Sequence, residues 1–215
     1  MSRETGPSCR QCRAVGKKLF LKGERCYNDE KCGVKRRAFP PGQHGGQRGG
    51  RRRRGATEYA IQLREKQRAR RTYGVSERQF GKYNDMAVKK KGITGELIFQ
   101  ALERRLDNVV YRLGFAASRK QARQLIRHRH FLVNKRILDI PSYLVKTDEV
   151  IEVKEKSKKV QTIRDAANSA SQRLRVPAWL ESNPLELRGS VLEMPVHEKM
   201  ELDFEEHLIV EYYSR

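Results

Sequence analysis

Four cysteines near the start of the chain have a spacing that could hold one metal ion. Two residues separate Cys9 from Cys12, and a looser pair, Cys26 and Cys32, follows after a longer loop. This arrangement lets four thiolates surround one tetrahedral ion, and a closed set of four ligands is typical of a structural site. We interpret the cysteines as the ligands of one structural zinc ion. An iron–sulfur cluster is the alternative, because such clusters also accept four cysteines.

Other residues offer little catalytic chemistry. His44 lies among Gly and Arg residues, where a histidine more often stacks on RNA or forms hydrogen bonds with it. Ser118 and Ser142 have no His or Lys arrangement that would activate a nucleophile. The chain contains no Walker-type phosphate loop and no convincing pair of carboxylates. The sequence therefore predicts a protein that is not an enzyme.

The charge of the chain is large and unevenly distributed. The 215 residues include 47 Lys and Arg against 26 Asp and Glu, a net charge of +21. Residues 1–91 are net +18, residues 92–160 net +7 and residues 161–215 net −4. Repulsion within the first segment opposes compaction, which favours a polyanionic partner. We expect nucleic acid rather than an anionic membrane, because no amphipathic helix with an aromatic or Leu face accompanies the charge.

Secreted and membrane proteins are not the expected classes. The first residues are charged and contain no apolar core of a secretory signal. No apolar run approaches the roughly 20 residues that a membrane helix needs. Without a secretory signal, the cysteines favour metal binding over disulfides.

Residues 1–56 form the first expected segment, a metal-bearing and Arg/Gly-rich extension. Its second half, residues 36–56, is rich in Gly, Pro and Arg and cannot build a core. Arginines in such a segment offer planar donors to phosphate and flat faces to bases. The residues expected to contact RNA here are Arg36, Arg37, His44, Arg51, Arg52, Arg53 and Arg54.

Residues 57–92 are expected to form two short basic helices. Thr57 and Ser76 are suitable N-caps, and Gly74 and Gly92 suitable stops. The first helix has Ala60 and Leu63 on its expected apolar stripe. The basic residues expected to bind RNA from its remaining surface are Arg64, Lys66, Arg68, Arg70 and Arg71.

Residues 93–160 are expected to form a small module of two helices packed on a short antiparallel sheet. One wide apolar stripe runs from Leu97 to Leu113, and Ser118 with Gln121 forms a capping box for the next helix. Short β-type runs at 131–134, 137–141, 143–145 and 149–153 follow. The basic residues expected on the outer face of the second helix are Arg119, Lys120, Arg123 and Arg127.

Residues 161–215 form an acidic segment that is expected to return onto the body of the protein. A helix is expected near 162–170, and the runs at 185–195 and 207–213 have strand-like content. The overall class is therefore α+β: a basic zinc-bearing extension and helical domain, followed by the small RNA-binding module.

Several long strings make the chain similar to a known family. Besides the cysteines, the strings are FPPGQHG at 39–45, YAIQLREKQRARRTYGVSERQF at 59–80, RLDNVVYRLGF at 105–115, SRKQARQLIRHRHFLVN at 118–134, VPAWL at 176–180 and IVEYYSR at 209–215. They resemble bacterial and organellar ribosomal protein four of the small subunit, nearly end to end. In one departure, Asn134-Lys135 stands where the family usually has Asn-Gly, which disfavours a tight type I′ turn.

The resemblance implies a specific role. It implies a constituent of the cytoplasmic or organellar ribosome that binds small-subunit (16S) rRNA directly, nucleates assembly of the subunit body and affects translational accuracy. It also implies contacts with small-subunit ribosomal protein five and with mRNA near the entry channel. Asn134 and the basic residues named above are the rRNA-binding candidates, and neither a membrane nor a small-molecule substrate is expected.

Two rival functions are disfavoured. The same module occurs in RNA-modifying enzymes such as pseudouridine synthases, but these need a large catalytic domain that the flanking segments are too short to supply. A zinc-finger DNA-binding factor is the second rival. The cysteine segment lacks a recognition helix with base-reading side chains, which argues against that function.

Overall fold

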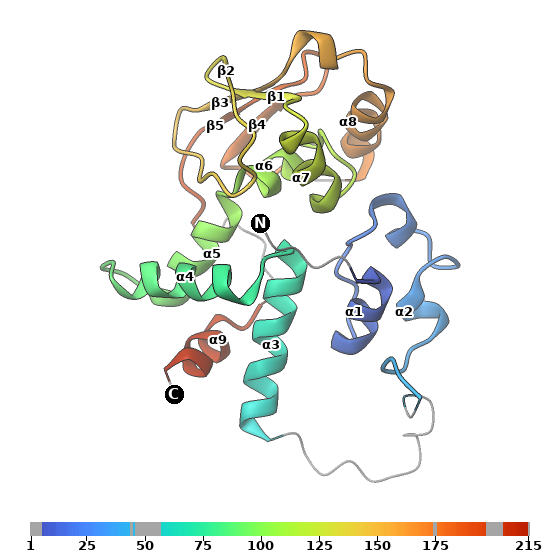
Figure 1. Cartoon of the computed structure of the whole chain (residues 1–215), viewed down its shortest axis with the longest axis vertical. Coiled ribbons are helices and arrows are strands. Elements are labelled where there is room, and N and C mark those ends of the chain that lie inside the picture. Colours follow the sequence, from blue (N-terminus) through green and yellow to red (C-terminus); the bar gives the residue numbers. More distant parts are fainter. Residues whose placement is uncertain (1–5, 44, 46–56, 174–175, 197–203, 215) are drawn as a thin grey trace. The chain divides into compact units, whose positions relative to one another are not determined.

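The computed structural model describes residues 6–43, 45, 57–173, 176–196 and 204–214 (Figure 1). The chain divides into two compact units. One comprises residues 1–95 and 203–215, and the other comprises residues 96–202. The acidic C-terminal segment is therefore shared, because its first part belongs to the second unit and its last residues belong to the first.

The described part of the first unit is helical. Its two longest helices have the caps that the sequence predicts: Thr57 accepts a hydrogen bond from the Ala60 N–H, and Ser76 accepts one from Gln79. Gly74 ends the earlier helix in the left-handed conformation, with φ +64°. The helices are α1 (Ser8–Val15), α2 (Gly33–Arg36), α3 (Glu58–Tyr73), α4 (Glu77–Val88), the start of α5 (Thr94–Glu103) and α9 (Glu206–Tyr213), with a 3-10 turn at Gly23–Cys26.

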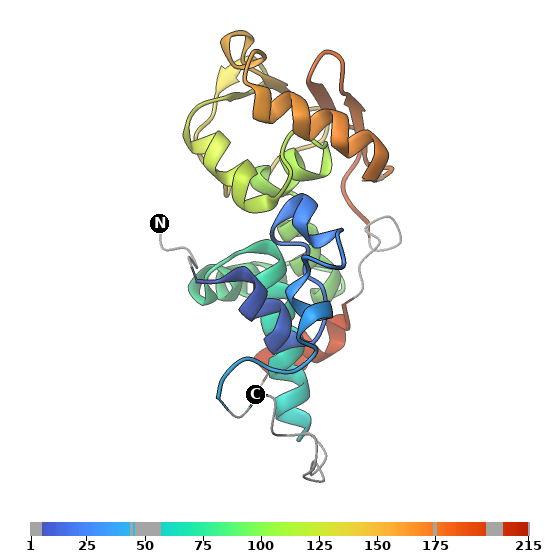
Figure 2. The same ribbon diagram turned by 90° about the vertical axis from the view of Figure 1, so that its right-hand side faces the viewer.

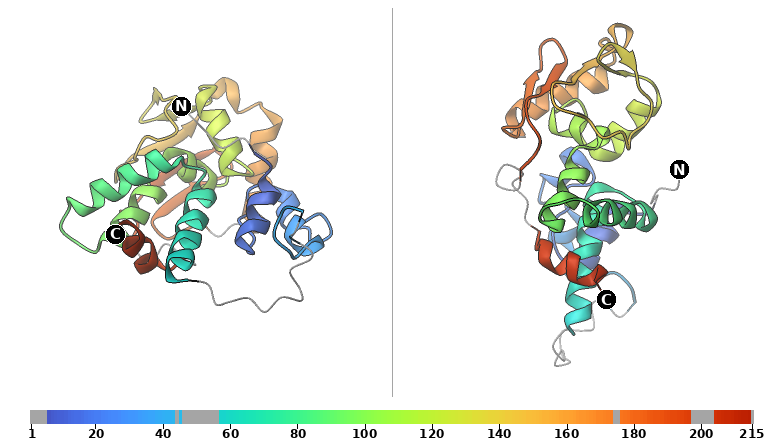
Figure 3. Two further views of the ribbon diagram at one scale, coloured as in Figure 1. Left: turned by 60° about the horizontal axis from the view of Figure 1, so that its bottom comes forward. Right: turned by 90° about the vertical axis from the view of Figure 1, so that its left-hand side faces the viewer.

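The buried face of α3 differs from the expected stripe. Gln62, Lys66, Ala69 and Tyr73 are buried, at a spacing of three or four residues, whereas Ala60 and Leu63 are only partly buried. The reason is tertiary: α9 packs along α3 (Figure 3) and supplies polar partners to this face. Residues 207–213 are thus helical, and the strand expected from their Ile, Val and Tyr content is wrong.

The second unit packs helices on one five-stranded antiparallel sheet (Figures 1 and 2), which confirms the α+β class. The sheet order is β2-β1-β3-β5-β4. The strands are β1 (Phe131–Val133), β2 (Arg136–Ile137), β3 (Val150–Val153), β4 (Leu180–Asn183) and β5 (Arg188–Val191), and the helices are the rest of α5, α6 (Leu106–Arg112), α7 (Arg119–Arg127) and α8 (Gln161–Arg173).

The sheet is larger than the sequence predicts. β5 pairs with β3, so the β4–β5 hairpin from the acidic segment extends the module sheet. Residues 143–145 form no strand and contribute only an isolated bridge between Leu144 and Arg105. The small module is therefore completed by residues that lie well beyond its expected end at 160.

The apolar stripe from 97 to 113 is divided between two helices. α5 ends at Glu103 and α6 begins at Leu106. The Leu106 N–H donates to the Tyr143 carbonyl at 2.8 Å, and the Asp107 N–H donates to the Pro141 carbonyl at 3.1 Å. These hydrogen bonds to the loop at 141–143 replace the helical hydrogen bonds at the break between α5 and α6. The apolar periodicity of the sequence does not reveal this break, because the stripe continues across it.

The hairpin at Asn134-Lys135 is tight despite its lysine. Both residues have positive φ, +48° and +64°, which is the arrangement of a type I′ turn, so the expectation against that turn is wrong. Asn tolerates this conformation, and its Oδ1 accepts a hydrogen bond from the Val150 N–H at 2.9 Å. Pairing of β1 with both β2 and β3 imposes the turn on Lys135.

The core of the second unit lies between α6, α7, α8 and the sheet. Phe115 and Phe131 stack with ring centroids 6.4 Å apart, and Trp179 is fully buried in the same cluster. Burial of each such side chain contributes on the order of 1.5–3 kcal/mol. This core determines which faces of α6, α7 and α8 are buried.

Candidate nucleic-acid interface

The four cysteines converge in the structure. Cys9 and Cys12 lie on α1, Cys26 ends the 3-10 turn and Cys32 directly precedes α2. All four line one cavity of about 20 Å³. A space of this size is enough for one water molecule or one ion.

The thiols have apolar neighbours, and one backbone N–H donates a hydrogen bond to a cysteine sulfur. Leu19 and Leu21 pack beside Cys12 in a small core of their own. The Lys22 N–H donates to the Cys26 sulfur at 3.3 Å. Burial raises the pKa of the Cys12 and Cys26 thiols, and repulsion from the other cysteines raises it further.

A formed metal centre is not seen in these thiols. Within the described ranges, no group of three or more His, Cys, Asp or Glu side chains makes a metal-ligand set. The donor chemistry nevertheless fits a thiophilic cation, because four cysteines line one ion-sized space and a divalent charge would relieve the repulsion between their thiolates.

The basic residues expected to bind RNA from the extension are only partly described. Arg36 and Arg37 are exposed, as an RNA-binding role requires. His44 and Arg51 to Arg54 lie outside the described residues, so their RNA contacts stay predictions.

The basic residues of α3 differ in how exposed their side chains are. Arg64 is exposed, whereas Arg70 and Arg71 are partly buried. Lys66 and Arg68 are buried within the α3 packing. The phosphate contacts expected of these two buried residues stay predictions.

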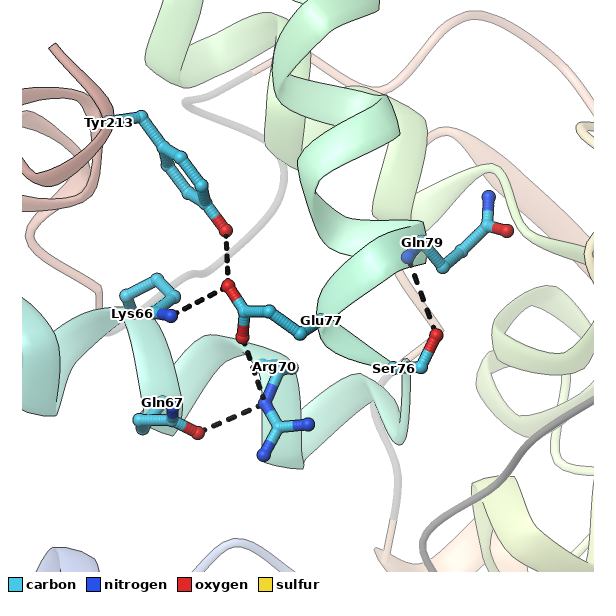
Figure 4. A network of polar contacts seen from close by, with 7 residues as sticks. All are labelled: Lys66, Gln67, Arg70, Ser76, Glu77, Gln79 and Tyr213. Carbon is cyan, nitrogen blue, oxygen red and sulfur yellow. Dashed lines mark hydrogen bonds and ion pairs between the residues drawn. The ribbon is translucent and has the colours of Figure 1, made fainter.

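Lys66 belongs to a polar network that fastens α9 to α3 and α4 (Figure 4). One Glu77 carboxylate oxygen accepts from the Lys66 ammonium at 2.7 Å and from the Tyr213 hydroxyl at 2.9 Å. Arg70 lies 3.6 Å from the other oxygen and also donates to Gln67. The Lys66 side chain is only 3% exposed. Its charge therefore serves the packing of α9.

The network makes the docking of α9 sensitive to acid. Burial alone would raise the pKa of Glu77, but hydrogen bonds from Lys66 and Tyr213 outweigh it and hold the pKa below its usual value. A carboxylate with a depressed folded-state pKa stabilises fully above its unfolded pKa of roughly 4.3, and this stabilisation is lost as the pH falls through the folded-state value.

We expect Tyr213→Phe to weaken the docking of α9 by about 1 kcal/mol at pH 7, because one hydrogen bond to a carboxylate is removed. The difference from wild type should shrink as the pH falls through the depressed pKa of Glu77, because the protonated carboxyl no longer accepts the Tyr213 hydroxyl as an anion. Hydrogen exchange of the α9 amides measures the effect. Tyr212→Phe is the matched control, and equal effects of the two substitutions would contradict the assigned network.

The basic face of α7 is less exposed than the sequence predicts. The Arg119 Nε donates to the Asn108 side-chain oxygen at 2.7 Å, and its guanidinium lies 4.6 Å from the centre of the Tyr111 ring. Arg123 lies 3.7 Å from an Asp107 oxygen, and its side chain is 13% exposed. Both arginines therefore contribute to packing, which corrects the expectation that the whole face lies outside the core.

Exposed cations remain on the second unit. Lys120 and Arg127 are exposed on α7, as the sequence predicts. Asn134 is exposed at the hairpin, although its side-chain oxygen accepts the hydrogen bond from the Val150 N–H of β3. Lys135 and Arg136 are exposed beside it and were not among the residues expected from the sequence. Recognition of Asn134-Lys135 as a two-residue hairpin loop would have predicted that these two cations are exposed.

A buried charged cluster holds α6 and α7 in place. Arg105 donates to both oxygens of Asp107, at 3.0 and 2.7 Å, and is 1% exposed. Glu103 accepts from the Asn108 side chain at 2.8 Å and from Arg112 at 2.9 Å. Asp107 is thus a structural anion, and Arg105 is the arginine that it holds.

Comparisons with known proteins show what the chain is similar to. Residues 3–103 match the family model described as ribosomal protein S4/S9 N-terminal domain, and residues 104–151 match the S4 domain. The chain is 56% identical to small ribosomal subunit protein uS4A of Symbiobacterium thermophilum and 54% identical to small ribosomal subunit protein uS4 of Acetivibrio thermocellus. Each alignment covers 100% of both chains. In the described residues, no helix has the length and apolar character to cross a bilayer.

Proposed function

The chain belongs to the uS4 family of small ribosomal subunit proteins, and from that membership we propose that it binds 16S rRNA directly and nucleates assembly of the subunit body. As a member of this family it is a structural, non-enzymatic component of the small subunit. Its place is the ribosome, where the family binds small-subunit rRNA.

The observation that carries the proposed mechanism is the set of cations whose side chains stay exposed in the folded chain. Arg64 on the first unit, and Lys120, Arg127 and the hairpin cations on the second, are exposed to solvent. Such cations bind phosphates, and a folded RNA junction is recognised by shape and backbone more than by base edges. The Arg51–Arg54 tract extends the same interaction along further phosphates.

Further parts of the proposal concern partners. Contact with small-subunit ribosomal protein five, a contribution to translational accuracy and proximity to mRNA at the entry channel follow from the family resemblance of the sequence. They are supported by identity above 50% along the entire chain.

The metal site is also a proposal. Cys9, Cys12, Cys26 and Cys32 hold one structural zinc ion, which supplies folding energy to the N-terminal head, defined here as residues 7–43. Support comes from the cavity that all four line and from the hydrogen bond donated to Cys26. An iron–sulfur cluster is the outcome that elemental analysis and the visible spectrum would distinguish from zinc.

We expect a Lys120→Gln, Arg127→Gln double variant to bind small-subunit rRNA at least tenfold more weakly than wild type. The slope of log affinity against log salt should also fall, by roughly 0.7–0.9 for each phosphate that the variant no longer neutralises. Filter binding over a salt series measures both quantities. The stability of the variant should stay within about 0.5 kcal/mol of wild type, because both residues are surface residues.

The matched control is Lys156→Gln, Lys159→Gln, which removes the same charge from exposed positions of the same unit. If the two double variants bind the RNA with equally reduced affinity, the α7 cations act only through net charge. That result would contradict the proposed interface on α7.

A further inference from the structure

The N-terminal head contains a basic hollow that is distinct from the thiol cavity. It has a volume of about 470 Å³, within the range of roughly 300–1,000 Å³ typical of ligand pockets. Residues from α1, the loop after it, α2 and the following turn form its walls. Its charged lining residues are Arg10, Arg13, Arg25, Lys31, Arg36 and Arg37.

Among the described residues, no carboxylate balances the charge of this hollow. None of the described residues that line it is Asp or Glu. Within the described part of the chain, none of its six cations forms an ion pair with a carboxylate, whereas the nearby Lys18 and Lys35 both pair with Asp29. Several cations converging on one concave surface repel each other, and an anion bound there removes the repulsion.

One wall of the hollow is attached to α1 through Arg13. The Arg13 guanidinium donates to the carbonyls of Phe39 and Pro40, at 3.0 and 3.2 Å, and lies 4.8 Å from the centre of the Phe39 ring. Gly42, which lines the hollow, has φ +113°. A Cβ on Gly45 would meet the Pro40 carbonyl oxygen. Arg13 thus links the turn at Pro40, Pro41 and Gly42 to α1. A larger residue at Gly42 or Gly45 would be strained.

The hollow shares part of its wall with the thiol cavity. Cys9, Arg25, Lys31 and Gly33 line both spaces. A Cβ on Gly33 would lie 2.9 Å from the Cys9 Cβ, so α1 and α2 are in close contact at this wall. The positions of the cations therefore depend on the same packing that brings the four thiols together.

We propose that this hollow binds a phosphate-bearing turn of RNA backbone. The inference rests on the proposed function and assigns to it a defined phosphate subsite. Five of the six cations are arginines, whose planar forks can match phosphate oxygens in pairs. The Nε and Nη2 of Arg13 already donate to carbonyls, and so does the Nε of Arg25, so the forks assigned to phosphate are those of Arg10, Arg36 and Arg37. Pro7 and Pro41 supply apolar surface beside the charge, against which a ribose or base can pack. The volume exceeds that of one phosphate group and suits a folded segment of nucleotides.

The test compares two full-length double variants that remove equal charge from the head. Arg10→Gln, Arg36→Gln changes the hollow, and Lys17→Gln, Lys35→Gln changes exposed positions outside it on the same segments. Affinity for small-subunit rRNA is measured over a salt series. Metal content and circular dichroism of each variant establish that the head remains folded, and Arg10→Lys, Arg36→Lys replaces the pair if it does not.

We expect the hollow variant to bind at least tenfold more weakly, because a charged hydrogen bond changes an equilibrium constant by about that factor. Its salt slope should fall by roughly 0.7–0.9 for each phosphate that it no longer binds. The affinity of the control should fall less than threefold. Equal reductions in the two variants would overturn the inference, whereas failure of wild type to prefer small-subunit rRNA would overturn the proposed function instead.

A second arm separates RNA phosphate from free phosphate. Sodium phosphate is titrated into the wild-type chain and into the hollow variant in a calorimeter. Weak binding to wild type, together with the RNA result above, supports an RNA subsite. Tight binding of inorganic phosphate that depends on Arg10 and Arg36, with unchanged RNA affinity, would make the hollow a small-anion site and overturn the inference.

Discussion

Asp107→Ala is expected to lower the free energy of unfolding of the second unit by about 3–5 kcal/mol, because it leaves a buried arginine without its anion. Asp107 accepts two hydrogen bonds from Arg105 and lies 3.7 Å from Arg123. The Arg105 side chain is only 1% exposed, so its charge does not reach bulk water in the folded chain. Urea denaturation followed by the fluorescence of Trp179, which is buried in the same unit, measures the change.

The matched control for this prediction is Asp139→Ala. Asp139 also pairs with an arginine, Arg129, at 3.1 Å, but both side chains are exposed. Exposed pairs contribute about 0–1 kcal/mol, so the free energy of unfolding of the control should fall by no more than that. A reduction for Asp107→Ala as small as the control's would show that the buried cluster does not hold α6 and α7.

Cys12→Ser is expected to reduce the bound metal from one zinc per chain to none. Structural zinc contributes roughly 10–16 kcal/mol to small zinc modules at pH 7, and this binding energy is local folding energy. The amides throughout residues 7–43 should therefore become unprotected. The second unit should keep its protection, because its core is separate. Elemental analysis and hydrogen exchange measure the two effects.

Ala14→Ser is the control for the metal prediction, because it adds a serine to the exposed face of the same helix. It should retain metal and protection. Wild-type protein that contains neither zinc nor iron after preparation without chelators would contradict the metal site. Full retention of zinc by Cys12→Ser would show that the ion is held elsewhere.

Local signals in the sequence predicted much of the fold. Thr57, Ser76 and Ser118 cap the helices that they were expected to cap, because a side-chain oxygen at these positions satisfies a free backbone N–H. The helix expected at 162–170 is present as part of α8. These features depend on a few neighbouring residues, and the sequence shows such residues directly.

The errors arose where distant segments decide the outcome. Lys66 is buried because α9 brings Tyr212 and Tyr213 to it, and its ammonium lies 4.4 Å from the centre of the Tyr212 ring. Residues 207–213 are β-prone in composition, yet they form a helix whose Ile209 is buried. Tertiary packing overrides such weak propensities.

Tertiary packing also explains why the sequence predicted only part of the candidate interface. Lys120 and Arg127 are exposed as expected, but Arg119 and Arg123 are drawn inward by Asn108 and Asp107. All four have similar helical spacing and charge, so periodicity alone does not distinguish them. The distinction comes from the polar groups of α6, a neighbour that the sequence pattern does not identify.

The central claim, that the chain is a direct binder of small-subunit rRNA, is tested most directly by chemical protection mapping of that RNA with the purified full-length chain. We predict a discrete set of protected nucleotides that appears at nanomolar protein and roughly physiological salt, where non-specific binding is weak. Large-subunit rRNA should show no comparable set at the same concentrations. Protection spread evenly over both RNAs, with equal affinity, would contradict the claim.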